Sequence, residues 1–341
     1  MKKLLFISIV VIPLFIIATF IGRYAMKFQQ TYTGPDKIFE VRNGDTFGRI
    51  NQRLFEDGLI SDKRLFHHYS KYKDVMTKFR AGSFTIPRGA NMTQVLQILI
   101  YGQPNLTSIT IPEGKNMYEI AKLLEAQGIT TEKEFLEAVQ HPDLIARLEV
   151  QANSLEGYLY PETYRFAPNT PAKVVAKSMI DLFVERTNEL SFMHPFLNKH
   201  QVIILASVVE KETGAKFERP MIAGVFTNRL KKRMRLQSDP TTVYGIWSRY
   251  KGNIKKSDLL EETPYNTYKI PALPRGPISN PSLEAIKAVL NPAEHNYLYF
   301  VSKNDGTHIF SKSYADHEKA VDDFQRNARA RQGKSWRDLK Q

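Results

Sequence analysis

Apolar residues fill the first part of the chain almost without interruption, from Leu4 to Gly22. Nineteen helical residues rise about 28 Å, close to the thickness of a bilayer's hydrocarbon core. The run therefore predicts a transmembrane helix over residues 4–22, and Pro13 within it is tolerated by membrane helices. A cleaved signal peptide is the alternative. A retained anchor is favoured, because the run exceeds a typical signal-peptide core and lacks a clear small-residue cleavage site.

Basic residues stand on both sides of this run, so the positive-inside rule orients it only weakly. Lys2 and Lys3 precede the run, and Arg23 and Lys27 follow it. We expect residues 1–3 to form a cytoplasmic tail and everything after Lys27 to be exported. The polar segment 23–38 reads as a linker.

The next part of the chain repeats one hydrophobic pattern three times. Stretches beginning at Phe39, Phe84 and Ile109 each combine a β-type run, a turn glycine and a helix-period segment. The turn glycines are Gly44, Gly89 and Gly114, and the glycines predicted to end the helices are Gly58, Gly102 and Gly128. These units predict an α/β module over residues 39–130. The segments NGDTFGRI and EGKNMYEI resemble a LysM-type glycan-binding module, and a plain α+β packing module is the alternative.

The remaining residues, 131–341, predict a separate catalytic domain of α+β class. Helical periodicity marks residues 172–190, the segments HQVIILASVVEKETG and ERPMIAGVFTNRLKKRM, the later LEAIKAVL, and a terminal amphipathic segment. NYLYFVSK and GTHIFSKS predict a hairpin with NDG at its turn. Loop-rich segments separate the helices from each other.

Two carboxylates stand at the end of the helix predicted from Gln201 to Thr213. This helix is apolar on nearly every face, which is typical of a core helix. At about 100° per residue, its mean apolar direction falls about 50° from Glu212 and about 100° from Glu210. Glu212 should therefore be desolvated, which keeps a carboxylic acid protonated as a general acid requires. The alternative is that both are surface carboxylates paired with nearby lysine or arginine.

Composition narrows the chemistry further. The chain has no cysteine, its eight histidines show no metal-binding spacing, and it has no P-loop and no GxSxG elbow. We therefore expect no cofactor and no metal. The formal net charge of +13 suits nucleic acid, anionic lipid or an anionic polymer. Export of the body of the chain argues against nucleic acid.

Several motifs occur in a characteristic order: SLEGYLYPETY, VEKETG, ERPMIAGVFTNRL, MRLQSDPTTVYG, and YNTY followed by LPRGPISNPS. In this set the chain resembles the YceG family of endolytic murein transglycosylases, from about Phe39 to the terminal helix. Arg275 departs from the family pattern, which usually has a second proline there. The resemblance implies that Glu212 is the catalytic glutamate. It also implies an inner-membrane anchor, a periplasmic catalytic domain, peptidoglycan strands as substrate, and peptidoglycan synthases as candidate partners.

Other polar and aromatic residues of these motifs suit a glycan cleft, because flat rings stack on sugars and loop polar groups bond to hydroxyls. Taken singly, each is more often structural. The candidate substrate-binding residues are Glu156, Tyr160, Glu162, Glu210, Gln237, Ser238, Asp239, Thr241, Tyr265, Asn266, Thr267 and Asn280.

The resemblance implies a lyase-type cut between N-acetylmuramic acid and N-acetylglucosamine, ending in a 1,6-anhydro ring. One carboxyl group suffices for that reaction, because the nucleophile is the sugar's own hydroxyl. A hydrolase normally needs a second carboxyl, which Glu156, Glu162 or Asp239 could supply. A muramidase that uses water and a non-catalytic glycan-binding scaffold are the two rival functions.

Overall fold

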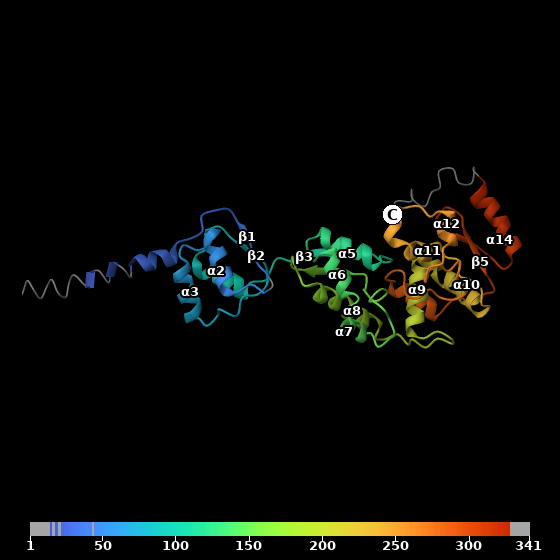
Figure 1. Cartoon of the computed structure of the whole chain (residues 1–341), viewed down its shortest axis with the longest axis horizontal. Coiled ribbons are helices and arrows are strands. Elements are labelled where there is room, and N and C mark those ends of the chain that lie inside the picture. Colours follow the sequence, from blue (N-terminus) through green and yellow to red (C-terminus); the bar gives the residue numbers. More distant parts are fainter. Residues whose placement is uncertain (1–13, 16–17, 20–21, 43, 328–341) are drawn as a thin grey trace, which may run out of the picture. The chain divides into compact units, whose positions relative to one another are not determined.

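The computed structural model describes residues 14–15, 18–19, 22–42 and 44–327, and its class is α+β as predicted. Most of the predicted membrane span 4–22 lies outside these residues. Among the helices that are described, none is long and apolar enough to cross a bilayer. The chain forms two compact units, each built around its own core (Figure 1).

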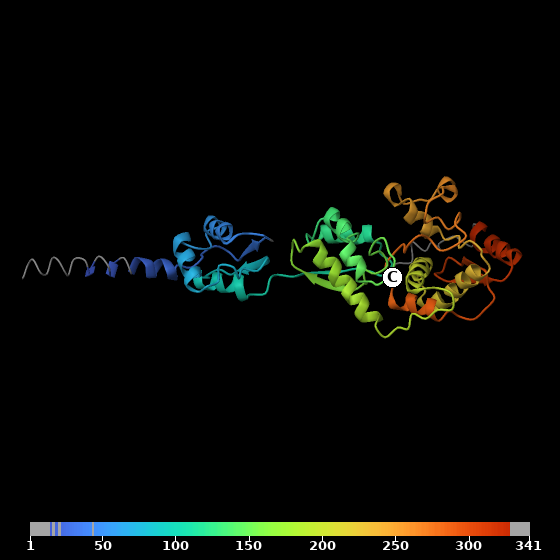
Figure 2. The same cartoon turned by 60° about the horizontal axis from the view of Figure 1, so that its bottom comes forward.

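The first unit comprises residues up to Ser108 together with 127–129 and 165–171. Its elements are β1 (Lys37–Val41), α2 (Phe47–Glu56), α3 (Lys63–Tyr72), β2 (Gly82–Ile86) and α4 (Met92–Tyr101). β1 and β2 pair antiparallel with Phe39 opposite Phe84. The buried faces of both strands and the apolar faces of the helices share one core. The turned view in Figure 2 shows the blue and cyan elements of this unit together.

Local signals set the ends of these elements. Asp62 caps α3 by accepting from the backbone N–H groups of Arg64 and Leu65, and Asn91 forms a capping box with Gln94 at the start of α4. Gly58 follows α2 in the left-handed region at φ +70°, as predicted for a glycine that ends a helix. Gly102 differs, because its φ of −65° leaves the chain extended after α4.

The second unit holds the rest of the described chain. Its first helices are α5 (Met117–Ala126), α6 (Glu132–Ala138), α7 (Pro142–Ala146) and α8 (Ala172–Thr187). The strands β3 (Thr107–Thr110) and β4 (Thr163–Phe166) are divided between the two units, since the boundaries fall after Ser108 and before Arg165. It continues with α9 (Lys199–Glu212), η1 (Lys216–Glu218), α10 (Arg219–Lys231), α11 (Asp239–Gly245), η2 (Trp247–Arg249), α12 (Lys256–Leu260) and α13 (Leu283–Leu290). It ends with β5 (Tyr299–Ser302), β6 (His308–Ser311), α14 (Tyr314–Val321) and η3 (Asp322–Arg326).

All three predicted strand–turn–helix successions are present, as β1–α2, β2–α4 and β3–α5. Their grouping differs from the predicted module 39–130, because α5 belongs to the second unit. The reason is packing: α5 lies against α6, and the N–H of Met117 donates to the carboxyl of Glu156 at 2.9 Å. A local repeat in sequence does not determine which core its helix joins.

Helix α9 is the centre of the second unit. Val202 to Val209 are buried without exception, and α9 packs against α10, α11 and α13 (Figure 1). Asn198 starts it with a capping box to Gln201. The predicted C-terminal hairpin is also present, since β5 and β6 pair antiparallel from Tyr299 opposite Ser311. A buried helix of this kind gives the residues at its end a fixed position.

Candidate active site

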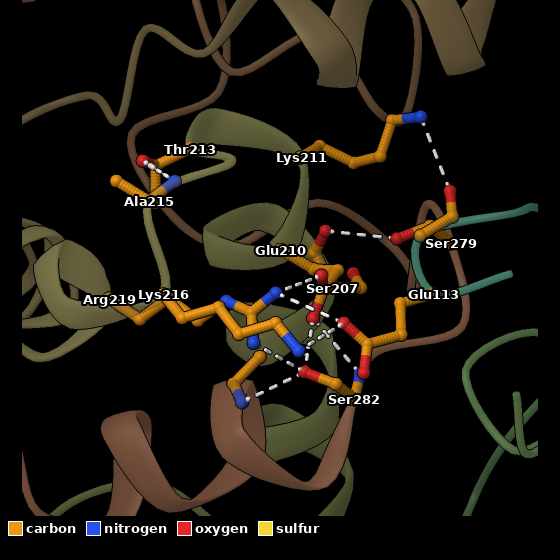
Figure 3. A network of polar contacts seen from close by, with 12 residues as sticks. Glu113, Ser207, Glu210, Lys211, Thr213, Ala215, Lys216, Arg219, Ser279 and Ser282 are labelled. Atoms are coloured by element: carbon orange, nitrogen blue, oxygen red, sulfur yellow. Dashed lines mark hydrogen bonds and ion pairs between the residues drawn. The ribbon is translucent and has the colours of Figure 1, made fainter. Parts of the chain in front are cut away.

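The two carboxylates at the end of α9 lie in different surroundings. Glu210 is held in a buried network that joins α9 to α10 and to the start of α13 (Figure 3). Arg219 contacts its Oε1 at 2.6 Å, and the backbone N–H of Ser282 donates to its Oε2 at 3.0 Å. The side chains of Glu210 and Arg219 are 4% and 3% exposed. Glu210 was predicted to contact substrate, but both of its carboxylate oxygens already accept hydrogen bonds from protein groups.

Arg219 extends this network to a third segment. Its guanidinium also contacts Oε2 of Glu113 at 3.3 Å and donates to the hydroxyl of Ser282 at 2.9 Å (Figure 3). Lys216 adds a longer contact of 3.9 Å to the same oxygen of Glu113. A buried pair with this many partners holds helix ends together. The Glu210–Arg219 pair therefore holds the last turn of α9 in place, two residues before Glu212.

Glu212 is the last residue of α9, and its carboxyl faces a different set of groups. The hydroxyl of Ser238 donates a hydrogen bond to its Oε1. Although the residue as a whole is only partly buried, desolvation of the carboxyl raises the pKa of Glu212 to about 7. The negative charge of Asp239 acts in the same direction, while the Ser238 hydrogen bond and the positive charge of Arg229 lower that pKa. A carboxyl with this pKa can give up and take back a proton near neutral pH.

Ser238 is itself held by a buried set of hydroxyl groups. Its N–H donates to Oγ1 of Thr267 at 3.0 Å, and Thr267 Oγ1 lies 2.8 Å from Oγ1 of Thr241. The Thr241 hydroxyl donates to the Ser238 carbonyl at 2.6 Å. Gln237, exposed and at φ +50°, brings the chain into this turn and bonds through its N–H to the Thr267 carbonyl at 3.2 Å. The serine facing Glu212 is thus positioned from both α11 and the loop before residue 268.

Asn266 completes the support of that loop. Its side-chain amide donates to the carbonyl of Glu261 at 2.7 Å, and its Oδ1 accepts from Thr242 at 3.0 Å. Asn266, Thr267 and Thr241 have no exposed surface. In this arrangement they hold the loop, where the sequence predicted direct contacts with substrate. The sequence did not distinguish polar residues that bond to each other from those that face solvent.

Two further charged residues, Asp239 and Arg229, act on the Glu212 carboxyl through their charge. Asp239 is exposed, and its Oδ1 accepts from the hydroxyl of Tyr268 at 2.7 Å. Arg229 is buried and donates to the carbonyls of Leu298 and Leu236, each at 2.6 Å. Sequence reasoning did not select Arg229. Its signal was an arginine three residues after the apolar run that ends at Phe226 in ERPMIAGVFTNRL.

Glu156 and Asn280 form a second buried polar cluster. Glu156 accepts from the Met117 N–H at 2.9 Å, the Tyr244 hydroxyl at 2.9 Å and the Asn280 amide at 2.8 Å. The Asn280 Oδ1 in turn accepts from the N–H groups of Gly157 and Leu159. Desolvation raises the pKa of Glu156 to about 8. These two predicted substrate groups therefore tie four segments together inside the unit.

The remaining predicted residues are spread along the unit. Tyr160 and Glu162 lie just before β4, where Tyr160 is partly buried and Glu162 is exposed and 3.6 Å from Arg186. Tyr265 is partly buried, with its ring centroid 4.7 Å from that of Tyr244. The structure brings Ser238, Asp239 and the loop at Thr267 to Glu212. Within the described residues it holds no cluster of three or more His, Asp or Glu side chains suited to a metal ion.

A family model described as the YceG-like family matches residues 39–323. This chain belongs to the YceG-like family. The matched residues include α9, α11, the loop before residue 268 and the cluster around Glu156. All the candidate-site groups described above therefore lie within the part of the chain that the family model covers.

Three known proteins illustrate what this YceG-like chain is similar to. An endolytic murein transglycosylase of Bacillus subtilis is 30% identical over 303 residues, which cover 83% of each chain. One of Streptococcus pneumoniae is 29% identical over 314 residues, covering 82% of this chain but only 57% of that longer protein. The crystal structure of a yceG-like protein from Listeria monocytogenes matches with a TM-score of 0.55 and 28% identity, covering 84% of this chain and all of that one.

Proposed function

We propose that this YceG-family chain is an endolytic murein transglycosylase in which Glu212 acts first as acid and then as base. The observation that carries the proposal is the Glu212 carboxyl, desolvated at the end of a buried helix and held by the Ser238 hydroxyl. Its pKa of about 7 provides both protonation states at neutral pH. The relatives named endolytic murein transglycosylases support the substrate and the reaction class.

The reaction proceeds without water. Protonated Glu212 gives its proton to the glycosidic oxygen between N-acetylmuramic acid and N-acetylglucosamine, and the bond from that oxygen to C1 breaks. The resulting carboxylate takes the proton of the muramyl 6-hydroxyl, whose oxygen forms a new bond to C1. The products are a free N-acetylglucosamine hydroxyl and a 1,6-anhydro-muramyl end. Glu212 is again protonated, so one carboxyl completes the cycle.

A hydrolase is the second candidate, because Asp239 is an exposed carboxylate close enough to raise the pKa of Glu212. It could orient a water molecule for attack at C1, as paired carboxylates do in glycosidases. Glu156 suits that role poorly, since both of its oxygens accept from buried protein donors. The two reactions differ in whether the new muramyl end is anhydro or reducing.

Mass spectrometry of muropeptides released from uncrosslinked glycan strands tests the proposal. We expect anhydro ends from the unmodified chain, and a loss of at least 10²-fold in rate for Glu212→Gln. Glu185→Gln, an exposed glutamate on α8, is the matched control and should keep full activity. Reducing ends would favour the hydrolase. Unchanged products from Glu212→Gln would remove Glu212 from the chemistry, and an inactive unmodified chain would favour a scaffold.

The surroundings in which the enzyme works are also part of the proposal. Residues 4–22 anchor the chain in the cell inner membrane, with residues 1–3 in the cytoplasm and the catalytic domain in the periplasm. Strands are then cut close to the membrane where they are made, which terminates their elongation and makes peptidoglycan synthases natural partners. A reporter fused after Gln341 should be active only outside the cytoplasm. Activity of that fusion inside the cell would overturn this topology.

The first unit acts as a LysM-like glycan-binding module. It holds a cavity of about 630 Å³ at the turn from β1 to α2, lined by Arg42, Asp45, Arg49 and Arg53 among others. Asp45 and Arg49 belong to the NGDTFGRI segment that resembles LysM, and Arg42 and Arg53 lie on either side of it. Binding there increases the local concentration of strand near the catalytic unit. The full chain with Arg49→Ala should bind strands more weakly than the unmodified chain, measured by strand pull-down. Equal binding would argue for a plain packing module.

A further inference from the structure

The second unit contains an aromatic cavity that is separate from the Glu212 carboxyl. Its volume is about 670 Å³, and Glu212 is not among the residues that line it. Four aromatic side chains line it, from α5, α11, η2 and the loop before residue 268: Tyr118, Tyr244, Trp247 and Tyr265. The cavity therefore gathers rings from four segments of one unit.

Two of the rings, those of Tyr118 and Trp247, are stacked on each other. They are nearly parallel, with 16° between their planes and 5.9 Å between their centroids. Both residues are partly exposed. Tyr244, whose ring is buried, lies with its centroid 6.0 Å from that of Tyr118, and its hydroxyl donates to Glu156 at 2.9 Å. The partly exposed Tyr118 ring thus lies between the buried Tyr244 ring and the ring of Trp247 in this set of contacts.

The polar groups of the cavity are of two kinds. Asn153 and Ser154 bring an amide and a hydroxyl to its wall, and Lys122 and Arg275 bring positive charge against the single carboxylate of Glu132. Apolar ring faces with a few amide and hydroxyl groups suit a sugar, which has both C–H faces and hydroxyls. The excess positive charge suits a sugar polymer that carries carboxylates, as the stem peptides of peptidoglycan do.

Two segments connect this cavity to the candidate active site. Helix α11 has Ser238, the partner of Glu212, directly before its first residue, and Tyr244 near its other end. Ser238 and Tyr244 are six residues apart, which corresponds to a rise of about 9 Å along a helix. The second segment contains Thr267, which bonds to Ser238, and Tyr265, which packs on Tyr244. The cavity and Ser238, the partner of Glu212, are thus both in contact with α11 and with the loop before residue 268, at different positions along these segments.

We propose that this cavity is a distal subsite that binds an intact part of the glycan strand away from the bond being cut, with Tyr118 and Trp247 as its stacking rings. The proposal rests on the proposed function, because it assigns the strand as ligand. An endolytic enzyme must bind sugars that are not at a strand end. A fixed contact displaced from Glu212 favours strands long enough to reach it. It also sets how much strand remains on that side of the cut.

Binding is tested in the full chain carrying Glu212→Gln, so that the strands remain intact. We expect Trp247→Ala to raise the Kd for long uncrosslinked strands about tenfold, as the loss of one stacking anchor does. It should change the Kd for a disaccharide muropeptide much less. Trp247→Phe keeps a ring and should restore most of the affinity. Tyr314→Ala, an exposed aromatic on α14, is the control and should bind as the parent does.

A second variant guards against misfolding. If Trp247→Ala lowers the Tm, Tyr118→Leu replaces it, since leucine keeps apolar volume without a ring. Arg275→Gln should weaken binding of stem-bearing strands more than of stem-free strands. With Glu212 restored, ring variants should yield a shifted distribution of product lengths. Unchanged Kd and product lengths for both ring variants would overturn the subsite. Absence of anhydro ends from the unmodified chain would instead overturn the proposed function, and the binding result would still stand.

Discussion

Ser238 donates its hydroxyl hydrogen to Oε1 of Glu212, from the turn that begins α11 to the residue that ends α9. This contact stabilises the charged form of Glu212 and lowers its pKa, in opposition to desolvation and to the charge of Asp239. The pKa of about 7 is therefore a balance of opposed effects. Two of these effects, the Ser238 hydrogen bond and the Asp239 charge, belong to residues that can be changed separately.

Replacing Ser238 with alanine removes an effect that lowers the pKa of Glu212, so that pKa should rise. The first step needs the protonated acid, and activity falls as the pH rises through this pKa. The alkaline limb of the kcat/KM profile should consequently move to higher pH in Ser238→Ala. Ser238→Thr retains a hydroxyl and serves as the control. A limb that stays in place would mean that this hydrogen bond does not control the acid.

Replacing Asp239 with asparagine should move the same limb in the opposite direction. The negative charge of Asp239 raises the pKa of Glu212, so its removal lowers that pKa and shifts the alkaline limb to lower pH. Asparagine keeps an oxygen for the Tyr268 hydroxyl, so the local contact can remain. If Asp239 instead activates water, Asp239→Asn will lose activity at every pH. The pH profile of kcat/KM distinguishes these outcomes.

Much of α9 could be predicted because its signal is local. A helix apolar on nearly all faces must be buried, and the Glu212 carboxyl is desolvated as predicted. Glu210 was predicted to face away from the apolar side, yet its side chain is only 4% exposed, because it pairs with the buried Arg219. The predicted ends of this helix differ from the observed ones by only one or two residues. Asn198 and the extended Thr213 set the observed ends. The roles of Glu212 and its neighbours in catalysis remain predictions.

The convergence of distant segments could not be predicted. Met117 and Glu156 are 39 residues apart, and their hydrogen bond ties α5, the helix of the third strand–turn–helix succession, into the second unit. Trp247 meets Tyr118 from a segment that showed no periodicity, so the sequence selected Tyr265 of this cavity but neither of these two rings. Arg229 was missed for the same reason, since its partners are two backbone carbonyls that any residue could supply.

Removing one partner of the Glu210–Arg219 pair should be strongly destabilising. Arg219→Met would leave the Glu210 carboxylate buried without its cation, and such changes cost about 3–5 kcal/mol. Lys177→Met breaks an exposed pair with Asp181 on α8 and should cost at most about 1 kcal/mol. Urea unfolding at pH 7 measures both. Equal losses would show that burial gives the Glu210 pair no special weight.

Glu156 should make the second unit less stable as the pH rises. Its pKa is raised from 4.5 to about 8 in the folded chain, so between these values the folded state binds a proton that the unfolded state has released. The free energy of unfolding therefore falls with rising pH across this window, by up to about 1.4 kcal/mol per pH unit. Glu212 adds to the same trend up to about pH 7.

Glu156→Gln tests this linkage because glutamine does not titrate. Urea unfolding midpoints measured from pH 5 to pH 8 should fall steeply in the unmodified chain and less steeply in Glu156→Gln. The comparison uses slopes, since the amide also changes the hydrogen bonds to Met117 and Tyr244 and so shifts stability at every pH. Glu185→Gln removes an exposed carboxyl and should keep the original slope. Parallel slopes in the unmodified chain and Glu156→Gln would mean that Glu156 is ionised inside the fold, and the three donors around it would then stabilise a buried charge.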